Sequence, residues 1–127
     1  MRKRRTLGGL AAAAVLTLVG VVGTAAPASA EYTHCLDVTG GLACWHTYGD
    51  WFSVHDALAD GAHVEVRWQS WGRSGTCIAS GNGDYQKCDY DLREGYQIKW
   101  YLEIWDGNTY VRGKYTTDCT ADVSVCI

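Results

Sequence analysis

Few residues of this chain have the type and spacing needed for acid–base or nucleophilic chemistry. The four histidines are scattered, and no serine lies in the G-x-S-x-G pattern of hydrolases. Glu65 and Glu103 are candidates for a glycosidase-like pair of carboxylates, but each is expected to point outward from a strand beside a basic neighbour. Such carboxylates are usually solvated or ion-paired, so we predict no catalytic residue and no enzymatic activity.

A hard cation such as calcium would find its best ligands in one acidic stretch, which contains Asn82, Asp84, Asp89 and Asp91. Their spacing fits no calcium loop, and turns favour Asp and Asn for conformational reasons alone. The cysteines form no C-x-x-C pair, which argues against a zinc site or a thioredoxin-like redox centre. We therefore predict no metal site and no cofactor.

Six cysteines follow residue 30, and an even number in a small exported chain predicts three disulfides. Cys77 and Cys88 bracket the turn at residues 81–84, so we expect them to close that hairpin.

The remaining four cysteines allow two tidy pairings. The nested pairing joins Cys44 to Cys119 and Cys35 to Cys126. The two residue numbers in each pair add to nearly the same value, as expected when the two end segments of the chain run antiparallel and lie opposite each other. The long loops of the nested pairing also constrain the unfolded chain more than short ones, so we favour it. The local pairing joins Cys35 to Cys44 and Cys119 to Cys126, and a turn at residues 39–41 would permit it.

Residues 1–30 have the three parts of a secretory signal peptide. Basic residues 2–5 precede an apolar run at 10–22, and Ala28-Ser29-Ala30 supplies the small-residue cleavage pattern. The basic start and the alanine-rich apolar run of this segment are typical of bacterial export signals. We therefore expect a secreted, extracellular protein whose domain covers residues 31–127.

After residue 30 the chain is acidic, with seven basic residues against fourteen acidic ones, a formal net charge of −7. This charge and the lack of a basic stripe argue against binding to nucleic acid or anionic lipid. No second apolar stretch occurs, so we expect no membrane span in the domain.

The dominant hydrophobic period is two, the period of strands. Gly, Asn and Asp turn signals separate strand-length segments, a pattern typical of a small antiparallel β-sandwich. We predict about seven strands, with room for an edge strand at each end: 42–48, 51–56, 62–71, 76–80, 85–90, 96–105 and 109–117. The fold prediction is thus all-β, one small sandwich with three disulfides.

Aromatic residues give the best functional signal. We expect Trp45, Trp51, Trp68 and Trp100 to build the core. A two-residue loop at 107–108 would pair the strands so that charges and rings share an outer face, with Tyr115 on the inner one. The candidate binding residues are Trp71, Tyr101, Glu103, Trp105, Tyr110 and Arg112.

The segment at residues 44–56, the Ala-Asp-Gly turn at 59–61 and the later cysteines resemble a pattern of small exported actinobacterial proteins. Some of these are similar to the small β-sandwich subunit of umbrella toxin particles, antibacterial assemblies in which it links a lectin-like subunit to a large repeat-containing toxin chain. The resemblance implies a non-catalytic adaptor. It also implies that Cys35 and Cys126, additions to the shared set, pair with each other.

We therefore expect an exported interaction module that binds another protein. The alternatives are a carbohydrate-binding, lectin-like domain, a secreted protease inhibitor and, last, a small hydrolase. Protein binding predicts an ordered edge strand or a flat aromatic patch. Sugar binding predicts coplanar exposed rings in a shallow groove, and a hydrolase predicts a deep pocket with converging titratable groups.

Overall fold

The structure is a computed structural model that describes residues 32–120 and residue 126; the predicted signal peptide lies outside these residues. The described chain is all-β, and none of it forms a helix suited to crossing a membrane. Its eight strands are β1 (Thr33–Val38), β2 (Gly41–His46), β3 (Trp51–Asp56), β4 (His63–Ser70), β5 (Arg73–Ser80), β6 (Tyr85–Asp89), β7 (Gln97–Asp106) and β8 (Thr109–Cys119).

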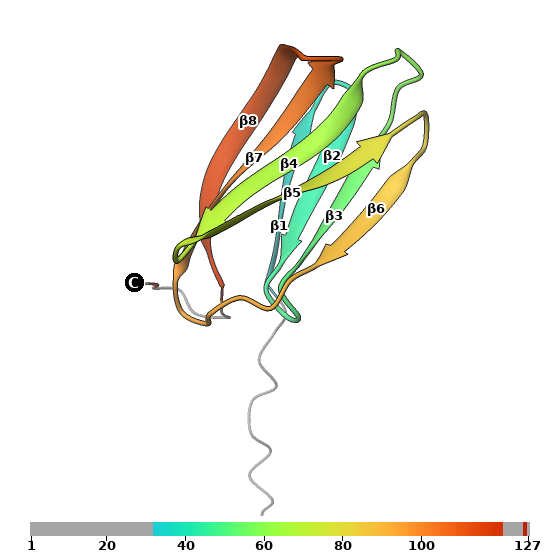
Figure 1. Cartoon of the computed structure of the whole chain (residues 1–127). Coiled ribbons are helices and arrows are strands. Elements are labelled where there is room, and N and C mark those ends of the chain that lie inside the picture. Colours follow the sequence, from blue (N-terminus) through green and yellow to red (C-terminus); the bar gives the residue numbers. More distant parts are fainter. Residues whose placement is uncertain (1–31, 121–125, 127) are drawn as a thin grey trace, which may run out of the picture.

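Two antiparallel sheets form the two layers of a sandwich (Figure 1). The first sheet has the order β1-β2-β3-β6 and the second the order β5-β4-β7-β8. The predicted all-β sandwich is confirmed, and β1 is the additional edge strand before the seven predicted ones.

The core lies between the sheets because strand residues alternate between the two faces. Val66 and Trp68 of β4 and Trp100 of β7 are almost fully buried in the second sheet. From the first sheet, Trp45 and Phe52 pack on each other with ring centroids 4.7 Å apart, and Phe52 meets Trp100 at 5.2 Å. Burying each such side chain stabilises the fold by about 1.5–3 kcal/mol.

Trp51 is the exception among the four predicted core tryptophans. Its neighbours Phe52 and Val54 are fully buried, so Trp51 points to the outer face of the first sheet. There its ring stacks on His46 at 3.5 Å with an interplanar angle of 0°. The prediction that Trp51 is a core residue was wrong, because strand parity outweighs residue type.

The disulfides confirm one sequence prediction and overturn another. The predicted pair Cys77–Cys88 is confirmed, but it does not close a hairpin: it joins β5 to β6, which are neighbouring edges of different sheets. The other two bonds are the local ones, Cys35–Cys44 and Cys119–Cys126, so the favoured nested pairing was wrong.

The reason is the direction of the side chains. Cys35 and Cys44 lie directly opposite each other in the β1–β2 hairpin, with Cα atoms 4.0 Å apart. Cys44 follows the buried Ala43 and precedes the buried Trp45, so it points away from the core. It therefore could not reach Cys119 across the sandwich. The implied Cys35–Cys126 pair was wrong for the same reason.

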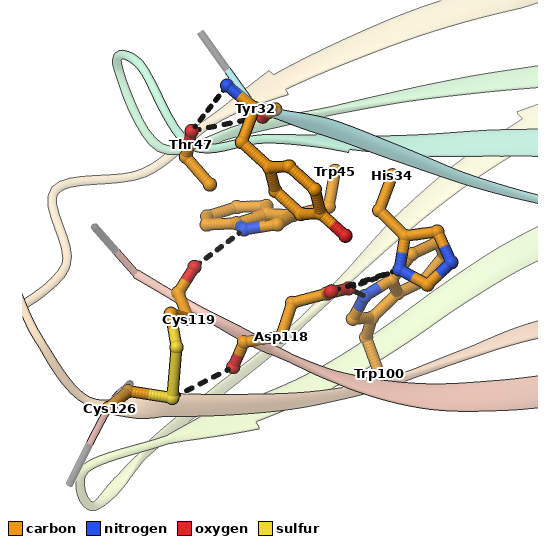
Figure 2. A network of polar contacts seen from close by, with 8 residues as sticks. All are labelled: Tyr32, His34, Trp45, Thr47, Trp100, Asp118, Cys119 and Cys126. Carbon is orange, nitrogen blue, oxygen red and sulfur yellow. Dashed lines mark hydrogen bonds and ion pairs between the residues drawn. A yellow bond between two sulfur atoms is a disulfide. The ribbon is translucent and has the colours of Figure 1, made fainter. Parts of the chain in front are cut away.

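On the opposite side, β1 and β8 connect the sheets through a polar network (Figure 2). The buried carboxylate of Asp118 contacts His34 Nδ1 at 2.9 Å and accepts a 2.7 Å hydrogen bond from Trp100 Nε1. Trp45 Nε1 donates to the backbone oxygen of Cys119 at 3.0 Å. These contacts fix the end of β8, and therefore the position of the strand that carries the outer tyrosines.

The β7–β8 hairpin contains a β-bulge that the sequence pattern did not reveal. Trp105 pairs with Tyr110 as predicted, but the register then shifts by one residue. Ile104 opposes Arg112 and Glu103 opposes Gly113, so the predicted Glu103–Arg112 pair was wrong.

Candidate functional site

The outer surface of the second sheet, called here the outer face, gathers rings and charges from three strands. β4 contributes alternate residues such as Arg67, and β7 contributes Tyr101, Glu103 and Trp105. β8 contributes Tyr110 and Tyr115, which are 52% and 66% exposed. The residues facing inward from β4 and β7 form the core, so this face is held on a rigid support.

An ion pair lies at the centre of the outer face. Arg67 donates from Nε to Glu103 Oε2 at 3.0 Å and from Nη2 to Oε1 at 2.6 Å. Trp105 Nε1 donates to Oε2 of the same carboxylate at 2.8 Å. Burial by itself raises the pKa of Glu103, but the hydrogen bonds from Arg67 and Trp105 and the guanidinium charge outweigh it and hold that pKa below its usual range. Glu103 is thus a buried, satisfied anion that orients Trp105.

Tyr101 lies beside this ion pair, and two cationic side chains lie close to its ring. The guanidinium of Arg67 lies 5.1 Å from its ring centroid, and the ammonium of Lys99 lies at 5.4 Å. Lys99 is also 5.0 Å from the ring centroid of Tyr115, and the two tyrosine rings are 5.6 Å apart at 36°. A hydrogen bond to Tyr101 raises the pKa of Lys99, which keeps the ammonium charged.

Trp105 and Tyr110 form the second aromatic pair, edge to face, with centroids 5.6 Å apart at 76°. The Tyr110 hydroxyl lies over Gly113, 3.2 Å from where a Cβ would stand. That Cβ would also lie 2.5 Å from the carbonyl oxygen of Leu102, so only glycine fits here. The bulge and this glycine together let the Tyr110 ring lie across β8.

Open hollows on this face share lining residues. One is lined by Arg67 and Tyr101 and continues past Gln69 and Ser74 into a second hollow of about 510 Å³. Others lie beside Trp105 and between Tyr101 and Tyr110. These open hollows suit the side chains of a docking surface better than a small-molecule substrate.

The structure brings together four of the six predicted binding residues: Tyr101, Glu103, Trp105 and Tyr110. Trp71 lies at the β4–β5 turn, at one end of the same face, where it lines the hollow that Lys99 also lines. Its ring packs on Tyr96 at 4.5 Å, and the guanidinium of Arg93 lies 4.8 Å from it.

Arg112 belongs elsewhere. It opposes the inward-facing Ile104, and its Nη1 donates a 2.7 Å hydrogen bond to the carbonyl oxygen of Thr39, in the turn between β1 and β2. Placing Arg112 on the outer face was wrong, because the bulge reverses the side-chain direction along β8.

Three residues of the outer face were not singled out from the sequence: Arg67, Lys99 and Tyr115. Strand alternation in β4 and β7 already placed the first two outward. Tyr115 was expected on the inner face opposite Trp100, and only the bulge turns it outward, opposite Tyr101. Gly113 is the single residue in the sequence that hints at this irregularity.

Two other candidate chemical groups, the His34–Asp118 pair and the acidic turn at Asp84, have structural partners. His34 and Asp118 resemble the orienting half of a hydrolase triad, but no described hydroxyl or thiol bonds the His34 Nε2 atom. The described residues contain no group of three or more metal-ligating His, Cys, Asp or Glu side chains. Asp84 accepts a 2.9 Å hydrogen bond from the backbone of Ser80, as a turn residue does.

The outer face of the first sheet is a weaker candidate. His46 stacks on Trp51, and the ammonium of Lys87 lies 4.5 Å from the centroid of the same ring. The Cys35–Cys44 disulfide occupies the neighbouring strands. Trp51 is therefore already covered by this chain's own side chains.

Comparisons with protein-family models, with curated proteins and with solved structures find no match. The resemblance to the small subunit of umbrella toxin particles therefore stays a prediction.

Proposed function

We propose that this domain is a secreted, non-catalytic module that binds another extracellular protein through the outer face of the second sheet. The observation that carries the proposal is the exposed aromatic cluster around the buried Glu103 carboxylate. Rings that are exposed yet fixed by a buried charge pair lose little conformational entropy on binding, which is the property of interface hot spots. Three disulfides are typical of proteins from oxidising compartments and support secretion.

The ring geometry favours a protein over a sugar as the ligand. Sugar stacking needs an open, flat ring face, but the pairs on this surface are tilted by 36° and 76°. Tyr101 already has two cations near its ring, and the Trp105 N–H is bonded to Glu103. Tyr110 and Tyr115 stay 52% and 66% exposed in rings that are not coplanar, an arrangement that suits an uneven protein surface.

Within this function, the motif resemblance supports an adaptor in an umbrella-type antibacterial toxin assembly. An adaptor must hold two partners without catalysing a reaction. The sandwich offers a rigid scaffold for this role. The Cys77–Cys88 disulfide joins its sheets at the β5 and β6 edges, and the polar network joins them at β1 and β8.

Site-specific photo-crosslinking tests the proposal. A photoreactive residue replaces Tyr110 on the outer face or, as control, Tyr85 on the first sheet, which is 56% exposed. After incubation with culture supernatant of the producing bacterium, we expect position 110 to crosslink one protein that position 85 does not. Equal products from both positions would contradict an outer-face site. Crosslinks at position 110 to glycan alone would support the lectin-like alternative instead.

A further inference from the structure

Among the residues that the structure describes, no carboxylate pairs with the ammonium group of Lys99, which lies on the same outer face as the Arg67–Glu103 ion pair. Glu65 and Glu103, the carboxylates that β4 and β7 place on this face, oppose each other four residues further along the strands. Both are already engaged, Glu103 by Arg67 at 2.6 Å and Glu65 by His63 at 3.3 Å. The described residues place tyrosine rings, and no carboxylate, against its ammonium group. A fully buried cation would need a carboxylate partner within the fold. A half-buried lysine that contacts aromatic rings does not, so its ammonium group can form an ion pair with a carboxylate of a ligand.

The hollow next to Lys99 is built for an acceptor ligand. Gln69 and Gln97 contribute side-chain amides, Ser74 contributes a hydroxyl, and Trp71 lies at its end. Gln69 is the direct cross-strand neighbour of Lys99, so an amide donor and the ammonium stand side by side. The lining thus combines two positive charges, those of Lys99 and Arg73, with neutral donors and an apolar ring, and it contains no carboxylate.

The charge distribution around this end of the sheet strengthens the argument. The domain is strongly acidic, yet Arg73 and Arg93 also lie at this end, and neither forms an ion pair with a described carboxylate. Arg93 has Asp91 and Glu94 near it in the chain, and Arg73 already donates to the carbonyl oxygen of Asp91, so Lys99 is the cation best placed to meet a ligand. At physiological salt, screening over about 8 Å isolates this region from the acids of the other sheet.

We infer that the partner places an acidic peptide segment in this hollow, with an Asp or Glu carboxylate on Lys99 and Gln69 and an apolar neighbour on Trp71. This inference rests on the proposed function and names the chemistry of the partner. We assign a peptide rather than an acidic sugar because the proposed function is protein binding, and because the Trp71 and Tyr96 rings are tilted by 40° and do not form the flat platform that a sugar ring needs for stacking.

The test is a titration of the ¹⁵N-labelled domain, followed by amide chemical shifts. The probes are a twelve-residue Glu-rich peptide containing one leucine, the same peptide with Gln for Glu, and an oligogalacturonate as an acidic sugar. We expect the Glu peptide to shift the amides around Lys99, Gln69 and Gln97, with affinity at least about ten-fold above that of the Gln peptide and falling with salt. Lys99→Gln should remove most of this preference.

Lys87→Gln is the matched control, because Lys87 also lies over an aromatic ring but on the other sheet. It should leave the titration unchanged. Equal binding of the two peptides, shifts centred elsewhere, or a preference for oligogalacturonate over the Glu peptide would each overturn the inference. Crosslinking at position 110 separates the two claims: if it persists undiminished in Lys99→Gln, the outer-face site stands and the acidic segment is rejected.

Discussion

The Arg67–Glu103 pair allows a quantitative prediction, because only one of its members is buried. The Glu103 side chain is 7% exposed and that of Arg67 is 49% exposed. Removing one member of a fully buried pair costs about 3–5 kcal/mol, whereas exposed pairs contribute about 0–1 kcal/mol. Arg67→Met leaves Glu103 with a single side-chain donor, Trp105, so we expect a cost between these limits, about 1–3 kcal/mol.

A double-mutant cycle isolates the interaction. Glu103→Gln removes the charge but keeps an acceptor for Trp105, so its own cost should be about 1 kcal/mol. In that background Arg67→Met should cost much less, giving a coupling energy of about 1–2 kcal/mol. The assay is urea unfolding monitored by tryptophan fluorescence, with m-values compared among the variants.

The control is the exposed pair of Lys87 and Asp89, whose side chains are 51% and 64% exposed. Its coupling should stay below about 0.5 kcal/mol. If the Arg67–Glu103 coupling is equally small, Glu103 is not the organising centre of the outer face. Because the folded-state pKa of Glu103 is lowered, this stabilisation should be present at neutral pH and lost as the pH falls below the unfolded value of about 4.5 and through the folded one.

Three further predictions follow from the fold. Trp100→Ala should lower the free energy of unfolding by about 3–5 kcal/mol in thermal melts, whereas Trp105→Ala should fold normally and lose binding to the partner protein. The reverse result would mean that Trp105 faces the core and Trp100 faces outward. Non-reducing peptide mapping should recover the three local disulfides and no free thiol, and a Cys44–Cys119 peptide would contradict the sandwich described here. Asp50, in the turn before β3, is buried and accepts a 3.0 Å hydrogen bond from the backbone of Leu92. Burial raises the pKa of Asp50, so wild type should lose stability relative to Asp50→Asn as the pH rises from the unfolded value of about 3.8 through the folded one; parallel urea midpoints would refute this.

The sequence predicts the fold well because period two is a direct physical consequence of the pleat. In β7 the alternation places Ile98, Trp100 and Leu102 inward and Tyr101 outward, and the structure agrees. The Trp51 error came from treating a large ring as core-forming, although the same alternation assigns the buried position to Phe52.

The two other errors concern information that a linear pattern does not carry. The disulfide argument compared loop lengths and ignored that Cys44 points away from the core. The hairpin argument assumed regular pairing, and the bulge in β8 then exchanged the places of Arg112 and Tyr115. A bulge depends on local backbone geometry around a residue such as Gly113, and the side-chain pattern does not specify it.

The central claim is that the outer face of the second sheet is the binding surface. The most direct measurement compares the Kd of the crosslinked partner, once purified, for Tyr115→Ser and for Tyr85→Ser. Both tyrosines are exposed, and each stands on the outer side of a different sheet. We predict that Tyr115→Ser weakens binding at least about ten-fold, about 1.4 kcal/mol, and that Tyr85→Ser changes it less than about two-fold. Equal effects, or a larger loss for Tyr85→Ser, would contradict the account.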